Sequence, residues 1–173
     1  MVTAAAVEHG LDPAVVAAFC AVESSWDTHA VNPEPAYRYL VDIRDGRPFR
    51  RLTPQEIASE SPPSDFQAPA GVPADAEWQL QQMSLGLMQV MGAVARECGF
   101  KGRFLTELCE PEIGLWCGCR KLAALSRGST TLDDIAAAYN AGSVRRDSDG
   151  RYVNQEYVDK IGAAYARYER EWS

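Results

Sequence analysis

Residues 12–27 read Asp-Pro-Ala-Val-Val-Ala-Ala-Phe-Cys-Ala-Val-Glu-Ser-Ser-Trp-Asp, and the rest of the chain is interpreted outward from this stretch. An aspartate is a favoured N-cap, and a proline suits the first helical position, where its missing N–H costs nothing. The stretch therefore predicts a helix from about Pro13 to Ser25. One face of this helix carries an apolar stripe that ends in a carboxyl group. Its members are Val16, Phe19, Cys20 and Glu23.

Glu23 has two possible interpretations at this point. Burial against an apolar stripe and the negative end of the helix dipole both disfavour the carboxylate, so both would raise the pKa of Glu23. A glutamic acid that stays protonated near neutral pH is suited to general-acid catalysis. The alternative is a helix-end glutamate that reaches solvent, which is the commoner fate of such a residue. The other motifs of the chain decide between the two.

Length and charge narrow the function classes. The 173 residues are enough for one domain with its own core, and a hydrophobic content of 46% is typical of a globular protein. A net charge of −7 argues against nucleic acid and against electrostatic adhesion to an anionic membrane. No run approaches the roughly 18 apolar residues of a membrane span, and the first ten residues do not resemble a signal peptide. We expect a monomer that is made in the cytoplasm.

The five cysteines do not suggest a metal site or a disulfide framework. They are an odd number, and the Cys-Gly-Cys spacing at 117–119 is too tight for a usual zinc knuckle. We interpret them mainly as small buried thiols and expect no metal and no cofactor.

The coarse pattern is mainly α, a single domain over residues 1–173 interrupted by a long proline-rich insert at 31–83. Eight of the ten prolines lie between residues 33 and 73, so a long helix is not expected there. Within the insert, Asp45-Gly46 favours a small β turn, and Thr53-Pro54 favours a short helix. Helical patterning returns at about Glu77. Further helices are predicted at about 91–98, 111–127, 132–142 and 155–172.

Three separated stretches resemble one family, the SLT-type lytic transglycosylases, which share a lysozyme-like α fold with goose-type lysozymes (glycoside hydrolase family 23-like). They are Glu-Ser-Ser-Trp at 23–26, Ser-Leu-Gly-Leu-Met-Gln-Val-Met at 84–91 and Ala-Tyr-Asn-Ala-Gly at 138–142. A weaker fourth is Tyr157-Val158. The resemblance covers about Leu11 to Ile161 apart from the insert.

The chain also departs from the family pattern. The link between the first two motifs is unusually long, Gly92 stands where proline often follows the second motif, and Asn154-Gln155 replaces the usual Glu-Thr. Long inserts of this kind resemble phage-encoded lysins. A phage lysin, a virion-associated protein or an excised domain would each act on the bacterial cell wall.

The resemblance implies cleavage of the β-1,4 bond between N-acetylmuramic acid and N-acetylglucosamine in peptidoglycan glycan strands. A lytic transglycosylase needs one carboxyl group, which acts first as acid and then as base while the sugar's 6-hydroxyl closes a 1,6-anhydro ring. Glu23 is the candidate for both roles. Hydrolases of this fold use a second acid. The position that often carries it is Met91 here, and residues 80–85 contain no acid.

Glu77 is then the nearest upstream carboxylate, expected either in the exposed first turn of a helix or at the substrate. The missing acids favour a transglycosylase. A hydrolytic muramidase or chitinase, and a non-catalytic glycan-binding or virion-structural module, remain alternatives.

The same resemblance suggests further substrate-binding residues. Ser24 and Ser84 would hydrogen-bond Glu23 or the N-acetyl group, while Met88 and Gln89 would line the cleft. Tyr139 and Tyr157 would place hydroxyls near the scissile bond, with core packing an equal alternative for both. We expect Asn140 to order its helix end, and Trp26 and Trp78 to be better candidates for sugar stacking than Trp116.

Overall fold

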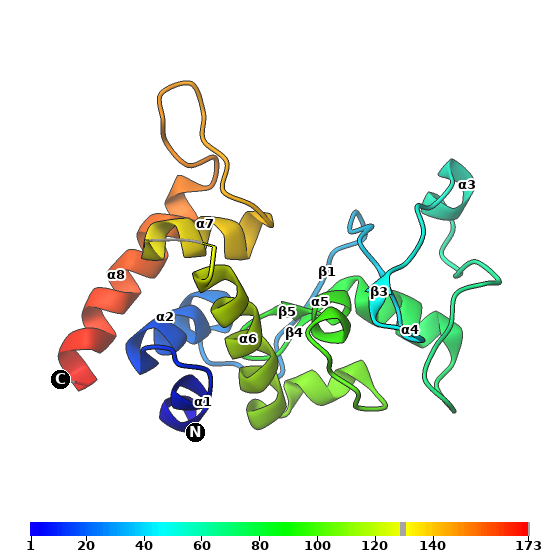
Figure 1. The fold of residues 1–173 in the computed structure, drawn as a ribbon, viewed down its shortest axis with the longest axis horizontal. Helices are drawn as coiled ribbons and strands as arrows, with labels where there is room; N and C mark the ends of the chain where they lie inside the picture. The colour runs from blue at the N-terminus through cyan, green and yellow to red at the C-terminus, as the bar shows by residue number, and fades with distance from the viewer. Residues whose placement is uncertain (129–130, 173) are drawn as a thin grey trace. The chain divides into compact units, whose positions relative to one another are not determined.

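The computed structural model of the protein describes residues 1–128 and 131–172 and confirms the prediction of a mainly α fold (Figure 1). The helices are α1 (Val2–Glu8), α2 (Pro13–Ser24), α3 (Pro54–Ile57), α4 (Ala74–Gln81), α5 (Gly92–Glu97), α6 (Pro111–Ser126), α7 (Leu132–Ala141) and α8 (Gln155–Trp172), with a 3-10 helix η1 (Leu105–Cys109). The strands are β1 (Val31–Pro33), β2 (Val41–Asp42), β3 (Arg47–Pro48), β4 (Met83–Leu85) and β5 (Val90–Met91).

The chain forms two compact units. The first unit comprises Met1–Trp26 with Gly118–Ser173, and the second comprises Asp27–Cys117. The expectation of a single domain therefore stays a prediction, and each unit is described by itself.

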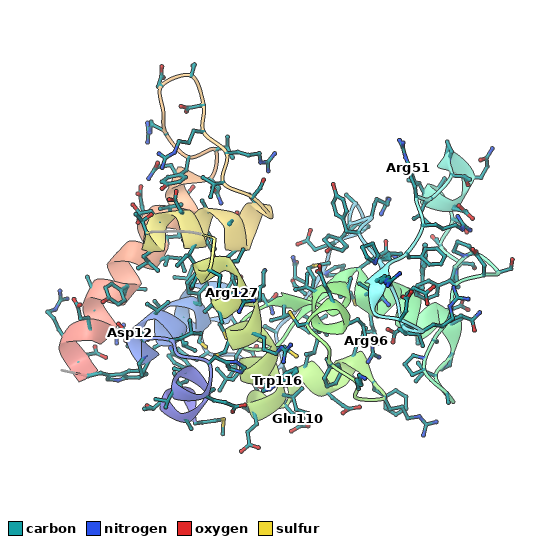
Figure 2. All side chains as sticks on the ribbon, in the orientation of Figure 1. Asp12, Arg51, Arg96, Glu110, Trp116 and Arg127 are labelled. Atoms are coloured by element: carbon teal, nitrogen blue, oxygen red, sulfur yellow. The ribbon has the colours of Figure 1, made fainter. Side chains whose placement is uncertain are left out.

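The first unit is built on the predicted helix α2. Asp12, labelled in Figure 2, caps it, because the Asp12 Oδ1 accepts a hydrogen bond of 2.8 Å from the backbone N–H of Ala14. The helix ends one residue earlier than predicted, at Ser24, since Ser25 takes a left-handed conformation with φ 53°. Small side chains let α2 lie close to α8 (Figure 1). The small side chains of α2 at this contact are Ala14, Ala17, Ala18 and Ala21. They pack with Ala164, Tyr165 and Tyr168 of α8.

The helix α7 joins the same unit against α8. The Thr131 Oγ1 accepts a hydrogen bond of 3.1 Å from the Asp134 N–H, so Thr131 caps α7, the helix predicted at about 132–142. Gly142 ends the helix at φ 75°, a conformation that suits glycine. Sequence reasoning missed α1, which packs on α2 and has no side-chain cap.

The second unit contains a three-stranded antiparallel sheet in the order β1-β4-β5. Val31 pairs with Leu85, and Leu85 pairs with Val90 across the next ladder. Sequence reasoning expected helical patterning to return from Glu77 onward, so these strands are a correction. The strands are two or three residues long, which is too short for a period-2 pattern to show in the sequence.

The insert has the local structures that its turn residues predicted. A hairpin of β2 and β3 turns at Gly46, with φ 71°, and the capping box of Thr53 and Glu56 opens α3. The insert also supplies a small apolar core around Trp78, which is only 3% exposed. Its other buried members are Leu40, Leu52 and Phe66. Trp78 is therefore a core residue in this structure, and the expectation that it stacks on sugar was wrong.

The thiols agree with the interpretation of the cysteines. All five are free, and Cys20, Cys117 and Cys119 are buried. Among the described residues, no helix has the length and apolar character needed to span a membrane.

Candidate functional site

Glu23 occupies the last turn of α2 in the first unit. Its side chain is partly buried, and this burial is the largest cause that raises the pKa of Glu23 above its ordinary value. A hydrogen bond from the Tyr157 hydroxyl and the positive charge of Lys121 act in the opposite direction and lower the pKa. The net direction of the pKa shift is upward, as predicted, and burial is its cause. Glu23 is thus a carboxyl group biased toward its protonated form.

Tyr157 lies in the first turns of α8, and its hydroxyl donates a hydrogen bond to the Glu23 Oε1. Burial is the main cause that holds the pKa of Tyr157 far above its ordinary range, and the neighbouring Glu23 adds to the effect. The phenol therefore stays protonated and remains a donor at any physiological pH. The packing of α8 on α2 brings together two residues that are 134 positions apart in sequence.

Tyr139 on α7 is buried beside these two residues. Its ring packs on Phe19 with the ring centroids 4.7 Å apart, and burial followed by the charge of Glu23 raises its pKa well above the ordinary value. The core-packing alternative for Tyr139 is therefore correct for its ring. Tyr139 therefore forms part of the buried surroundings of Glu23.

Lys121 on α6 is the residue of this site that sequence reasoning missed. Its Nζ lies 3.5 Å from the centroid of the Tyr139 ring and donates a hydrogen bond of 2.9 Å to the Tyr139 carbonyl oxygen. These contacts hold the cation at the C-terminal part of α7, where it lowers the pKa of Glu23. The available signal was a lysine within the apolar pattern of residues 113–125.

Three more predicted residues belong to the first unit. The Ser24 Oγ donates to the Cys20 carbonyl oxygen at 3.1 Å. The Asn140 Oδ1 accepts from the Asn154 Nδ2 at 3.0 Å, which supports the view that Asn140 orders its helix end. Trp26 is 40% exposed, and its Nε1 donates to the Tyr168 hydroxyl at 2.9 Å. Its exposed ring leaves the predicted sugar-stacking role of Trp26 open.

The second motif forms the β4–β5 turn of the second unit, and its glutamine holds that turn together. The Gln89 Oε1 accepts from the Ser84 Oγ at 3.0 Å, and the Gln89 Nε2 donates to the carbonyl oxygens of Ala30 and Gly86, both at 3.0 Å. Both amide hydrogens are thereby used, and only one lone pair of Oε1 is left for a ligand. Met88 is fully buried. The structure thus gives Ser84, Met88 and Gln89 a structural role in this turn, and their contact with substrate stays a prediction.

Glu77, in the first turn of α4, is fully buried, so the expectation of an exposed position was wrong. Its Oε1 accepts from the Arg96 Nε at 2.8 Å, and its Oε2 accepts from the Arg96 Nη2 at 2.9 Å (Figure 2 labels Arg96). The Gln81 Nε2 donates to the same Oε1 at 3.0 Å. A carboxylate with both oxygens bound to one guanidinium is poorly placed to activate a water molecule.

The described residues contain no group of three or more histidine, cysteine, aspartate or glutamate side chains that could hold a metal ion.

A carboxyl group with a raised pKa lies at a helix end of this mainly α fold and accepts a hydrogen bond from a tyrosine hydroxyl, an arrangement suited to general acid–base chemistry. The family model described as transglycosylase SLT domain matches residues 1–161. The chain belongs to this family, whose enzymes are peptidoglycan lytic transglycosylases. No curated protein matches the chain. The resemblance stated from the motifs is thereby confirmed, and peptidoglycan is the substrate class of the domain.

Proposed function

We propose that the protein cleaves the β-1,4 bond between N-acetylmuramic acid and N-acetylglucosamine and leaves a 1,6-anhydro end on the muramic sugar. The observation that carries this proposal is the environment of Glu23. Burial favours its protonated form, while the Tyr157 hydroxyl and the Lys121 cation favour its carboxylate. One group supported in both protonation states is what a one-carboxylate reaction requires.

The reaction balances without water. The Glu23 carboxyl group gives its proton to the glycosidic oxygen as the bond from that oxygen to C1 breaks, and the N-acetylglucosamine end leaves as an alcohol. The 6-hydroxyl oxygen of the muramic sugar then bonds to C1 and passes its proton to the Glu23 carboxylate. The acid is regenerated, and Tyr157 keeps its own proton throughout.

The position of Glu77 supports the transglycosylase over the hydrolase. A hydrolase of this fold would need a second carboxylate to direct water at C1. Glu77 was the nearest candidate in sequence, and both of its oxygens are bound to Arg96 in a fully buried pair. Among the described groups that shift the pKa of Glu23, there is no second carboxylate.

The test is mass spectrometry of the soluble products from purified sacculi. We expect muropeptides that end in 1,6-anhydromuramic acid, and Glu23→Gln should release none while still binding sacculi. Reducing ends, one water heavier, would identify a hydrolase instead. Equal product from Glu23→Gln and the wild type would refute the assignment of Glu23, and binding without any product from either protein would indicate a glycan-binding module.

A further inference from the structure

The segment between α7 and α8 is a short hairpin arm, residues 143–153, which projects from the first unit (Figure 1). An isolated bridge joins Arg146 to Tyr152 across the arm. The Asp147 N–H donates to the Arg151 carbonyl oxygen at 2.9 Å, and the Val153 N–H donates to the Arg145 carbonyl oxygen at 3.1 Å. The backbone of the arm is therefore an ordered antiparallel pair, with its side chains alternating between two faces.

The inner face of the arm is anchored to α7. The Tyr152 hydroxyl donates to the Asp134 Oδ1 at 2.7 Å, and Tyr152 itself is buried. The Arg146 guanidinium lies 3.9 Å from the centroid of the Tyr152 ring, its Nη1 donates to the Gly150 carbonyl oxygen at 2.9 Å, and its Nη2 is 3.4 Å from the Asp134 Oδ1. One of the three arginines of the arm is thus used to hold the arm in place.

The opposite face carries the other two arginines, Arg145 and Arg151. Both are exposed, and within the described residues neither side chain has a hydrogen bond or an ion pair. Val153 beside them is 54% exposed. The acidic neighbour on this face, Asp147, has its Oδ1 turned to the backbone, where it accepts from the N–H groups of Asp149 and Arg151 at 3.0 Å each. The face therefore presents two guanidinium groups beside the carboxylate of Asp147. With Asp149 included, residues 143–153 carry three arginines and two aspartates, a net charge of +1 in a protein whose net charge is −7.

The root of the arm adjoins the candidate acid. The Asn154 Nδ2 closes the root by donating to the Asn140 Oδ1 at 3.0 Å and to the Ala137 carbonyl oxygen at 3.2 Å. Tyr157, which contacts Glu23, follows three residues later, about one helical turn along α8. From root to tip each strand of the arm has about four or five residues, which limits its reach to roughly 15 Å.

We propose that the outer face of this arm binds the carboxylates of the peptide stem carried by the muramic sugar. This inference rests on the proposed function, because that sugar is the one whose C1 would react at Glu23. The glycan backbone is uncharged, so the anionic groups nearest to the reacting bond are the carboxylates of the stem. Guanidinium groups bind carboxylates through paired, charge-assisted hydrogen bonds. The remaining negative charge of the protein would repel an anionic stem elsewhere.

The test compares the double variant Arg145→Gln, Arg151→Gln with a matched double variant, Arg127→Gln, Arg170→Gln. All four side chains are exposed arginines of the first unit without a partner in the described structure, and each pair changes the net charge by the same amount. The substrates are intact sacculi and stripped strands, which are glycan strands whose stems an amidase has removed and whose freed lactyl carboxyl groups have then been converted to uncharged amides.

Binding is measured by cosedimentation with each protein also carrying Glu23→Gln, so that the result does not depend on product chemistry. We expect the arm variant to bind stem-bearing sacculi roughly three- to tenfold more weakly at low salt, with the difference shrinking at high salt. Its binding to stripped strands, and the binding of the matched variant to both substrates, should equal that of Glu23→Gln alone.

When Glu23 is kept, the weaker binding of the arm variant should appear as a raised KM on intact sacculi, with kcat unchanged. Unchanged binding to sacculi, an equal loss on stripped strands or an equal loss in the matched variant would each overturn the inference. Failure of the proposed function would show separately, as the absence of anhydro ends in the products of the wild type.

Discussion

Replacing Glu77 by glutamine separates a structural glutamate from a second catalytic acid. The side chain keeps its size, but it loses the charge that balances Arg96. Both oxygens of Glu77 accept hydrogen bonds from that guanidinium, at 2.8 and 2.9 Å, and the pair is almost completely buried. An amide can accept through only one of its two positions, so one N–H of Arg96 would face an N–H of the new side chain.

The expected cost follows from leaving a buried charge without its partner. Breaking such a pair by removing one member destabilises a protein by about 3–5 kcal/mol. This is a large part of the roughly 5–15 kcal/mol that separates folded from unfolded domains. For a chain of this length the loss corresponds to a melting temperature lower by roughly 6–20 °C. Below that temperature, the rate of cleavage of sacculi per folded molecule should stay close to that of the wild type.

Urea unfolding followed by tryptophan fluorescence, with turbidity clearing of sacculi as the activity assay, measures both quantities. Glu112→Gln is a matched control, because Glu112 is exposed on α6 in the same unit and has no side-chain partner among the described residues. It should change neither stability nor activity. An unchanged urea midpoint together with a lost cleavage rate would refute the structural assignment of Glu77. The same result would support the hydrolase mechanism.

Three further predictions concern the neighbours of Glu23. Tyr157→Phe removes a hydrogen bond that lowers the pKa of Glu23, so the alkaline limb of the pH–rate profile should move to higher pH and the rate should fall roughly 10- to 100-fold; an unmoved limb would contradict the assigned hydrogen bond. Lys121→Met should move the same limb in the same direction while Lys121→Arg leaves it in place, and a shift to lower pH would contradict the assigned charge effect. Glu23→Gln should be more stable than the wild type at about pH 8 and equally stable at about pH 4, because a raised folded-state pKa costs stability as pH rises from the ordinary value through the folded value. Equal urea midpoints of the two proteins at both pH values would show that burial of Glu23 has no such cost.

The helices could be predicted where their signals are local. Asp12 and Pro13 fix the start of α2 within a few residues, and Thr53 with Pro54 located α3 in the same way. The sheet of the second unit could not be predicted in this way. Its ladder joins Val31 to Leu85, 54 positions apart, through strands of two or three residues. Such a register depends on how the intervening insert folds, and no local pattern records that.

The candidate site likewise has features that local sequence predicts and features that depend on the fold. The raised pKa of Glu23 was predictable from its own helix, because its cause is burial and the apolar stripe that predicts burial is a sequence feature. The partners were not, since Tyr157 reaches Glu23 only through the packing of α8 on α2. For Glu77 the local signal predicted an exposed side chain, and the structure shows a buried one. An acidic residue in the first turn of a helix usually faces solvent, and the guanidinium that permits its burial comes from another helix, 19 residues later.

The chain places two partly or fully buried glutamates in contrasting surroundings, and the contrast argues for where the chemistry occurs. Glu77 is paired with the full positive charge of Arg96, and both of its oxygens accept hydrogen bonds from that guanidinium. Glu23 is given a neutral donor, the Tyr157 hydroxyl, while the cation of Lys121 is held against Tyr139. A neutral hydrogen bond stabilises the carboxylate less than a bidentate guanidinium would, and burial then still favours the acid. An arginine in place of Tyr157 would favour the ionised form of Glu23 and oppose its proposed role as acid. A purely apolar site would disfavour the carboxylate and oppose its proposed role as base. The intermediate arrangement at Glu23 is the one that the proposed function requires of a single group acting first as acid and then as base.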